Sequence, residues 1–230
     1  MTNVVNINEG ALKINVLWSS GLDSTYLVYS LLEQGHCVNA QYFEVENNSK
    51  KSKHELQQRD RMAVFFKQKY GYKFIYSKTP TAKILINDVG TVKLVQALAW
   101  ISCSILTLRE ECQYMAIGYV KGDDAIEFLE DIKNAFNALK KLSYSEAELI
   151  FPMKDMDKKT IYENLPDELK DEIFWCEYGD TKGATCWCKP CIKAREYGIL
   201  SKYQYSKQLE EYKLLKDEES LRYNMKVAAE

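Results

Sequence analysis

Glycine and proline are both scarce in this chain. Its 230 residues include 10 glycines and 4 prolines, which argues against low-complexity segments and extended linkers. The length suits one domain, or one domain with an appendage. Hydrophobic residues make up 46% of the sequence, so the chain can build a substantial core.

Strong net charge and long apolar runs are absent as well. The formal net charge is -2 at pH 7, and charges of both signs are interspersed, which argues against a protein that coats duplex nucleic acid. The most apolar segment, residues 92–108, contains several polar side chains and is short for a bilayer span. Residues 1–10 are polar and do not form a secretory signal. We therefore expect a cytoplasmic protein with no membrane partner.

Strand-like and helical segments alternate along the first part of the chain. We expect strands over residues 13–18, 37–43, 72–76, 114–117 and 148–151. Helical spacing of apolar residues predicts helices over 23–34, 55–70, 92–110 and 125–142, and the polar stretch 44–53 is expected to be a loop. This alternation is typical of parallel crossovers. The predicted fold class is therefore α/β, with a doubly wound parallel sheet followed by a cysteine-bearing region and a charged helical tail over 200–226.

A polar corner follows the first predicted strand. Its sequence is Ser19-Ser20-Gly21-Leu22-Asp23-Ser24. At the carboxyl end of a parallel strand, the glycine permits a tight turn, and the N–H groups that begin the next helix attract a phosphate or pyrophosphate. Asp23 fits such a site if it shares a divalent cation with the phosphates, or if it favours the helix dipole. The alternative is an ordinary capped turn without a ligand.

Four of the seven cysteines crowd into the C-terminal region; they are Cys176, Cys186, Cys188 and Cys191. Four thiolates from a loop and a tight knuckle can surround one tetrahedral Zn²⁺, and the metal would replace the apolar core that this segment lacks. Redox chemistry of the Cys-x-x-Cys pair and unligated buried thiols are the alternatives. We expect structural zinc, because four cysteines would close the coordination shell.

The corner and the cysteine knuckle together resemble one enzyme family. The corner is similar to the PP-loop of the N-type ATP pyrophosphatases, usually Ser-Gly-Gly-x-Asp-Ser, with Ser20 in place of the first glycine. The cysteines, followed by Arg195 and an aromatic-glycine pair, resemble the knuckle of the 7-cyano-7-deazaguanine synthases, the ExsB-like, queuosine-precursor branch of that superfamily. One residue of that knuckle is missing between Cys186 and Cys188. The segments HELQQRDRMA (54–63) and FPMKDMDKKTIYENL (151–165) are also similar, so the resemblance spans roughly residues 13–200.

The resemblance implies a fold, a reaction and a set of ligands. The fold is Rossmann-like, of the adenine nucleotide alpha hydrolase type, with a PP-loop ATP-binding domain over residues 1–165 and a zinc knuckle with a helical tail over 166–230. The implied enzyme uses ATP and Mg²⁺ to adenylate the carboxylate of 7-carboxy-7-deazaguanine. Ammonia then displaces AMP to give an amide, and a second activation dehydrates it to the nitrile. A homodimer is implied as well.

The same resemblance assigns roles to two residues in the corner and to three beyond it. Lys158 lies at the family's helix-opening lysine and is a candidate phosphate ligand, which makes Asp23, Ser24 and Lys158 the expected catalytic residues. A solvated lysine at a helix start is the alternative. Tyr42 and Phe43 are candidates to border the adenine, and packing at the edge of the core is the alternative for them.

Gly118 opens the segment after the fourth strand, where the family binds its base. The acidic residues Asp123 and Asp124 nearby would accept hydrogen bonds from a deazaguanine edge, close to Tyr119. Their alternative role is to cap the helix that begins near Ala125.

Two stretches that belong to the family's substrate side are missing. NDVGTVKLVQALAW (87–100) lacks the family's Pro-x-Arg-Asn, and EVENNSKKSK (44–53) replaces its Gly-Gln-Arg-His run. The ATP machinery is thus retained while the acceptor is open. One alternative is a divergent PP-loop enzyme that adenylates a tRNA base or a protein carboxyl, for example in a phage or defence system. Another is a nucleotide-binding module without turnover, which the loss of glycine at position 20 would favour.

Overall fold

The computed structural model describes residues 10–46, 49–85, 94–108, 111–173, 175–176 and 188–196. The chain forms two compact units, Met1–Phe174 and Trp175–Glu230. The predicted charged tail over 200–226 lies outside the described residues. None of the helices in the described ranges is long and apolar enough to cross a bilayer.

A five-stranded parallel sheet forms the centre of the first unit. Its strands are β1 (Lys13–Leu17), β2 (Cys37–Gln41), β4 (Phe74–Tyr76), β6 (Tyr114–Ala116) and β7 (Glu148–Ile150). Their order across the sheet is β4-β2-β1-β6-β7, and every neighbouring pair is parallel. In the centre of the sheet, Val16 lies opposite Ala40 on one side and Ala116 on the other. The predicted α/β class with a parallel sheet is confirmed, and it is consistent with a Rossmann-like fold.

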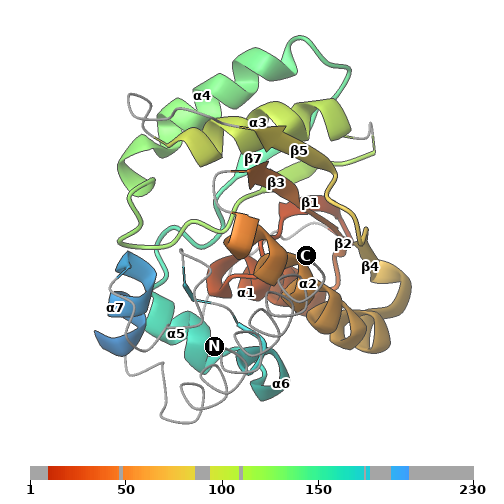
Figure 1. Cartoon of the computed structure of the whole chain (residues 1–230). Helices are drawn as coiled ribbons and strands as arrows, with labels where there is room; N and C mark the ends of the chain where they lie inside the picture. Colours follow the sequence, from red (N-terminus) through yellow and green to blue (C-terminus); the bar gives the residue numbers. More distant parts are fainter. Residues whose placement is uncertain are drawn as a thin grey trace, which may run out of the picture. The chain divides into compact units, whose positions relative to one another are not determined.

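Helices cover both faces of this sheet (Figure 1). On one face lie α1 (Leu22–Glu33) and α2 (Ser49–Tyr70), and on the other lie α3 (Val95–Thr107) and α4 (Leu129–Lys140). The short helices α5 (Lys158–Glu163) and α6 (Asp167–Lys170) follow β7, and α5 contacts α1. Two 3₁₀ segments, η1 (Gly71–Lys73) and η2 (Ile126–Phe128), precede β4 and α4. The second unit contains α7 (Lys189–Glu196).

Helix α1 shows how local sequence fixes an element. Its apolar residues Leu27, Val28 and Leu31 recur at helical spacing and are fully buried. The helix ends at Glu33, and Gly35, two residues later, has a φ of +90°, as the sequence predicts for a glycine after a helix end. The N–H of Gly35 donates to the Leu32 carbonyl (3.0 Å) and that of His36 to the Leu31 carbonyl (3.1 Å), which satisfies carbonyls that the helix end would otherwise leave open.

The hydrophobic core on the α3/α4 face joins strands and helices that are far apart in sequence. Phe43, Ile101, Met115, Phe136 and Leu149 all pack in it and are at most 2% exposed. This packing fixes the sheet on which the candidate site is built.

Two expectations about residues 37–53 are wrong. The strand predicted over 37–43 ends at Gln41, and a separate strand, β3 (Phe43–Glu46), pairs with the parallel strand β5 (Ala82–Leu85), which the sequence analysis did not predict. The loop predicted over 44–53 is occupied by β3 and by the start of α2 at Ser49. The physical reason is tertiary pairing, because the polar residues of β3 acquire their hydrogen-bond partners from a strand that lies far along the chain.

Candidate active site at the carboxyl edge of the sheet

The strand order reverses between β1 and β6. From β1 the chain continues through α1 to β2 on one side, whereas β6 and β7 lie on the other side. In parallel sheets such a switch point leaves a crevice at the carboxyl ends of the strands, where ligands bind. The segments that follow β1 and β6 meet closely here: a Cβ atom on Gly118 would lie 3.2 Å from the backbone of Asp23 and Ser24. A side chain at position 118 would therefore crowd this close approach, and a glycine avoids that crowding.

The corner that the sequence singles out lies at this switch point and is tied together by its own hydroxyl groups. The Ser24 hydroxyl accepts a hydrogen bond from the N–H of Ser19 (3.2 Å) and lies 3.2 Å from the Ser19 hydroxyl. Helix α1 begins after Gly21 without a side-chain cap. Leu22, within the corner, is buried. The start of a twelve-residue helix is thereby presented at the crevice, which favours an anion there.

Ser20 adopts a left-handed backbone conformation, with φ of 65°. A side chain with a Cβ pays about 1–2 kcal/mol in this region, so a serine at this position has an energetic cost that a glycine would avoid. The Ser20 hydroxyl offsets part of that cost, because it donates to the carbonyls of Ser19 and of Glu55 in α2 (3.0 Å for Glu55). Ser20 is fully buried, and its hydroxyl thereby ties the corner to α2.

Three charged side chains from distant segments converge beside the corner. The Lys158 ammonium lies 2.7 Å from Asp23 Oδ2 and 3.2 Å from Asp123 Oδ1. All three side chains are about one-fifth exposed, at 17% for Lys158, 22% for Asp23 and 20% for Asp123. Burial by itself lowers the pKa of Lys158, but the two carboxylates outweigh it and raise the pKa above its ordinary value. Lys158 is therefore a firmly charged group at the mouth of the corner.

Local turns hold Lys158 and Asp123 in place. Asp157 caps α5 by accepting a hydrogen bond from the N–H of Thr160 (2.9 Å), so Lys158 is the first residue of the helix. Asp123 accepts a hydrogen bond from the N–H of Val120 (3.1 Å), within the segment that follows β6. That segment is joined to the one before α5 by a bond from the Lys121 N–H to the Met156 carbonyl (2.9 Å). The structure thus brings Asp23, Ser24, Gly118 and Lys158 together.

Tyr42 and Phe43, which follow β2, lie in different surroundings. Phe43 packs in the core on the α3/α4 face. Tyr42 is buried on the α2 side, where its hydroxyl donates to Glu55 Oε2 (2.6 Å). Asp124 is exposed, and the Tyr119 ring lies near Phe151 in a tilted arrangement, with ring centroids 6.0 Å apart.

A buried arginine near the corner was not identified from the sequence. Arg59 of α2 is fully buried, and its guanidinium carbon lies 4.7 Å from the Tyr42 ring, 4.9 Å from the Tyr76 ring and 5.2 Å from the Trp18 ring. Burial lowers the pKa of Arg59 to about 10, so it is still charged at neutral pH. The only signal in the sequence is an arginine in a polar helical stretch, which is usually solvent-exposed.

The aromatic contacts do not fully offset the free-energy cost of burying the Arg59 cation. Each cation–π contact contributes up to about 2 kcal/mol when desolvated. However, none of the three guanidinium nitrogens has a hydrogen-bond partner among the described residues, and a buried charged donor left unsatisfied costs more than about 1–3 kcal/mol. The rings neutralise part of the charge but accept no strong hydrogen bonds.

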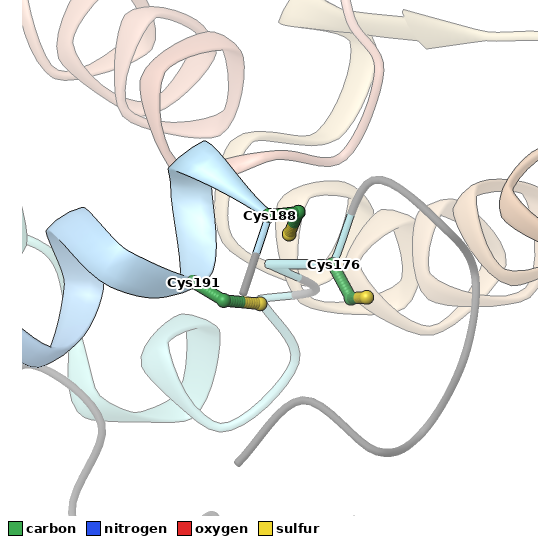
Figure 2. A group of neighbouring side chains, drawn as sticks. All are labelled: Cys176, Cys188 and Cys191. Atoms are coloured by element: carbon green, nitrogen blue, oxygen red, sulfur yellow. The ribbon is translucent and has the colours of Figure 1, made fainter. Parts of the chain in front are cut away.

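Three cysteines of the second unit form a cluster that can bind a metal ion. The sulfur atoms of Cys176, Cys188 and Cys191 all lie within 4.8 Å of one another, and all three residues are buried. Figure 2 shows them grouped around the start of α7. Cys188 precedes this helix and its carbonyl accepts from the N–H of Ile192 (3.0 Å), so the two-residue gap places Cys191 in the first turn. The fourth expected ligand, Cys186, lies outside the described residues.

The chemistry of this cluster fits a thiophilic metal. Hydrogen bonds with Cys176, burial and the neighbouring Cys188 raise the pKa of Cys191 well above its ordinary value. Several thiols crowded into a buried space cannot ionise together unless a cation offsets their charge. A bound metal provides that charge, and Zn²⁺ and Fe–S clusters are the groups that thiolates select.

No protein-family model and no curated protein sequence matches this chain. The functional assignment therefore depends on the chemistry of the site.

Proposed function

We propose that this protein is an ATP-dependent enzyme of the PP-loop type, which adenylates a carboxylate and then aminates it. The observation that carries the proposal is the convergence of the corner, Asp23, Asp123 and Lys158 at the switch point of the sheet. A helix start, a firmly charged lysine and two carboxylates are the groups that a triphosphate with its metal ion requires.

The residues divide the work by charge. The N–H groups that begin α1, with the hydroxyls of Ser19 and Ser24, would bind the β- and γ-phosphates. Lys158 would exchange its carboxylate partners for phosphate oxygens. Asp23 and Asp123 would hold Mg²⁺, which neutralises the phosphates when bound. Catalysis would come from positioning and charge stabilisation rather than from a side-chain nucleophile.

The reaction balances without an oxidant or a protein nucleophile. A carboxylate oxygen of the acceptor attacks the α-phosphorus, and pyrophosphate leaves. Ammonia then attacks the acyl carbon and AMP leaves, which gives an amide. A second adenylation on the amide oxygen, followed by loss of AMP, gives a nitrile. The acceptor we propose is 7-carboxy-7-deazaguanine, on the strength of the resemblance in the corner and the knuckle.

The cysteine cluster supports the same family. We propose that Cys176, Cys188 and Cys191, with Cys186 as the fourth ligand, hold a structural Zn²⁺. The family also implies a homodimer, which light scattering on the purified protein would test.

The test is a reaction with ATP, Mg²⁺, ammonium and 7-carboxy-7-deazaguanine. Pyrophosphate, AMP and the nitrile are expected together, and Asp23→Asn, which keeps the size of the side chain, should abolish their release while the protein stays folded by circular dichroism. AMP release that depends on another carboxylate or on tRNA would keep the adenylation and change the acceptor. No pyrophosphate release with any of these acceptors would reject the enzyme.

A second candidate is a nucleotide-binding module without turnover, which the left-handed Ser20 favours. A rigid corner with its hydroxyls already paired would bind a triphosphate and resist the adjustment that in-line attack requires. Calorimetry that detects ATP binding, in a sample that releases no pyrophosphate, would support this candidate over the enzyme.

A further inference from the structure

Arg59 is the most unusual charged group in the described part of the chain. It lies one helical turn beyond Glu55, whose carbonyl anchors Ser20, and beside Trp18, the residue that precedes the corner. Its position is therefore just behind the corner, at the carboxyl ends of β1, β2 and β4. The proposed adenylation does not use it.

Two carboxylates whose negative charge acts on this guanidinium do not hydrogen-bond to it. The Glu55 carboxylate accepts the Tyr42 hydroxyl, and the Asp60 carboxylate accepts the Tyr76 hydroxyl. None of the three guanidinium nitrogens has a hydrogen-bond partner among the described residues. A planar fork of N–H donors buried without acceptors matches the geometry of a carboxylate or a phosphate.

The three rings around Arg59 differ in how firmly they are held. Trp18 is 1% exposed, and its indole N–H donates to Thr25 (3.0 Å). Tyr42 is 4% exposed and donates a hydrogen bond to the largely buried side chain of Glu55. Tyr76 ends the edge strand β4, is only partly buried, and is held by the exposed Asp60. Access to the guanidinium is therefore from the Tyr76 side.

We propose that Arg59 is an oxyanion-binding residue, which takes a phosphate or carboxylate group of a ligand when the Tyr76 ring swings aside. The bound oxyanion supplies the hydrogen-bond acceptors that the fold itself does not provide. Arg59 is then retained for binding rather than for stability. The inference goes beyond the proposed adenylation, because it requires an anion and no turnover.

The experiment compares thermal unfolding of the full chain with and without three probes: pyrophosphate, AMP and 7-carboxy-7-deazaguanine. We expect at least one probe to raise the Tm of the wild type. Arg59→Met should weaken the binding of that probe roughly tenfold or more. A shift with the first two probes identifies a phosphate, and a shift with the third alone identifies a carboxylate. In the absence of a probe, the Tm of Arg59→Met should equal or exceed that of the wild type, because an unpaired buried cation has been removed.

Arg61→Met is the matched control. Arg61 lies in the same helix, is half exposed and pairs with Glu172 (2.8 Å), so its removal should leave every probe shift unchanged. If Arg59→Met fails to fold, Arg59→Lys replaces it, and loss of the planar fork should weaken the probe by a similar factor.

Three results would overturn the inference. The first is that no probe shifts the wild type. The second is that the probe-induced increase in Tm persists in Arg59→Met or Arg59→Lys but is lost in Lys158→Met, which would place the bound anion at the corner. The third is that Arg59→Met lowers the Tm and leaves all probe shifts intact, which makes the arginine a packing element. None of these results depends on whether pyrophosphate is released during turnover.

Discussion

Lys158 Nζ lies 2.7 Å from Asp23 Oδ2, although 135 positions separate the two residues in the chain. The same ammonium reaches Asp123 at 3.2 Å. One cation thus holds together the start of α1, the segment after β6 and the start of α5, which are the three segments that border the crevice.

Lys158→Met should therefore damage both stability and nucleotide binding. Two partly buried carboxylates lose their counter-ion, which we expect to cost about 1–3 kcal/mol of unfolding free energy, and ATP binding should fall at least tenfold. Urea unfolding and calorimetry measure the two effects. Lys159→Met is the control, since the neighbouring Lys159 is 60% exposed and pairs only weakly with Glu163 at 3.9 Å. Equal behaviour of the two variants would contradict the role of the cluster.

The left-handed conformation of Ser20 predicts which of two substitutions, to alanine or to glycine, is the more stable. Ser20→Ala loses the hydroxyl bonds but keeps a Cβ in the left-handed region, whereas Ser20→Gly loses the same bonds and relaxes the backbone. We expect the glycine variant to be the more stable of the two by about 1 kcal/mol in urea unfolding. At Ser30, inside α1, the order should reverse by about 1 kcal/mol, because glycine is the poorer helix former. The same order of stability for glycine and alanine at both positions would contradict the left-handed conformation of Ser20.

Gly118→Ala should disturb the corner directly. The added methyl group meets backbone atoms of Asp23 and Ser24 at 3.2 Å, and backbone cannot rotate away as a side chain can. We expect a loss of about 1–3 kcal/mol in unfolding free energy, together with weaker ATP binding. Gly10→Ala, where a Cβ would meet nothing within 4 Å, should be close to neutral. Normal ATP binding by Gly118→Ala would show that the corner does not need this close approach.

Cys188→Ser should remove the metal from the second unit. Mass spectrometry of the native protein is expected to show about one Zn²⁺ per chain, and the variant should lose most of it along with thermal stability. Cys37→Ser is the control, because Cys37 lies in β2, outside the cluster. Metal content that is unchanged in Cys188→Ser would exclude this thiol from the ligand set.

Glu55 and Glu33 should show opposite pH dependence. Burial raises the pKa of Glu55 above its ordinary value, so the folded state favours the protonated acid, and its contribution is lost as the pH rises above about 4.5. The free energy of unfolding of Glu55→Gln should therefore rise relative to that of the wild type as the pH increases from 4.5 to 8.

A hydrogen bond from Tyr70 lowers the pKa of Glu33. The stabilising contribution of Glu33 is present above its unfolded pKa and is lost as the pH falls. The free energy of unfolding of Glu33→Gln should therefore decrease relative to that of the wild type as the pH increases. Urea unfolding between about pH 3 and pH 8 measures both pairs, because the Glu33 effect develops mainly below about pH 4.5. Stability curves that stay parallel to that of the wild type would contradict the assignment.

Much of the local structure was predictable because its causes are local. The apolar stripe of α1 and Gly35 at its end follow from side-chain spacing and backbone freedom, and the structure has both. The gap between Cys188 and Cys191 similarly predicts two thiols that meet, and the structure brings them together at the start of α7. The β3–β5 pair escaped prediction because each segment has only four residues and becomes a strand only when a distant partner supplies its hydrogen bonds.

The sequence by itself determined the alternation of strands and helices, the polar corner after β1 and the crowding of cysteines, since each depends on residues close together in the chain. The tertiary structure alone decided that Ser20 is left-handed, that Lys158 meets Asp23 and Asp123, and that Arg59 is buried among three rings. Those features depend on which strands become neighbours. Strand order is set by the packing of the whole sheet, and no single segment of the sequence encodes it.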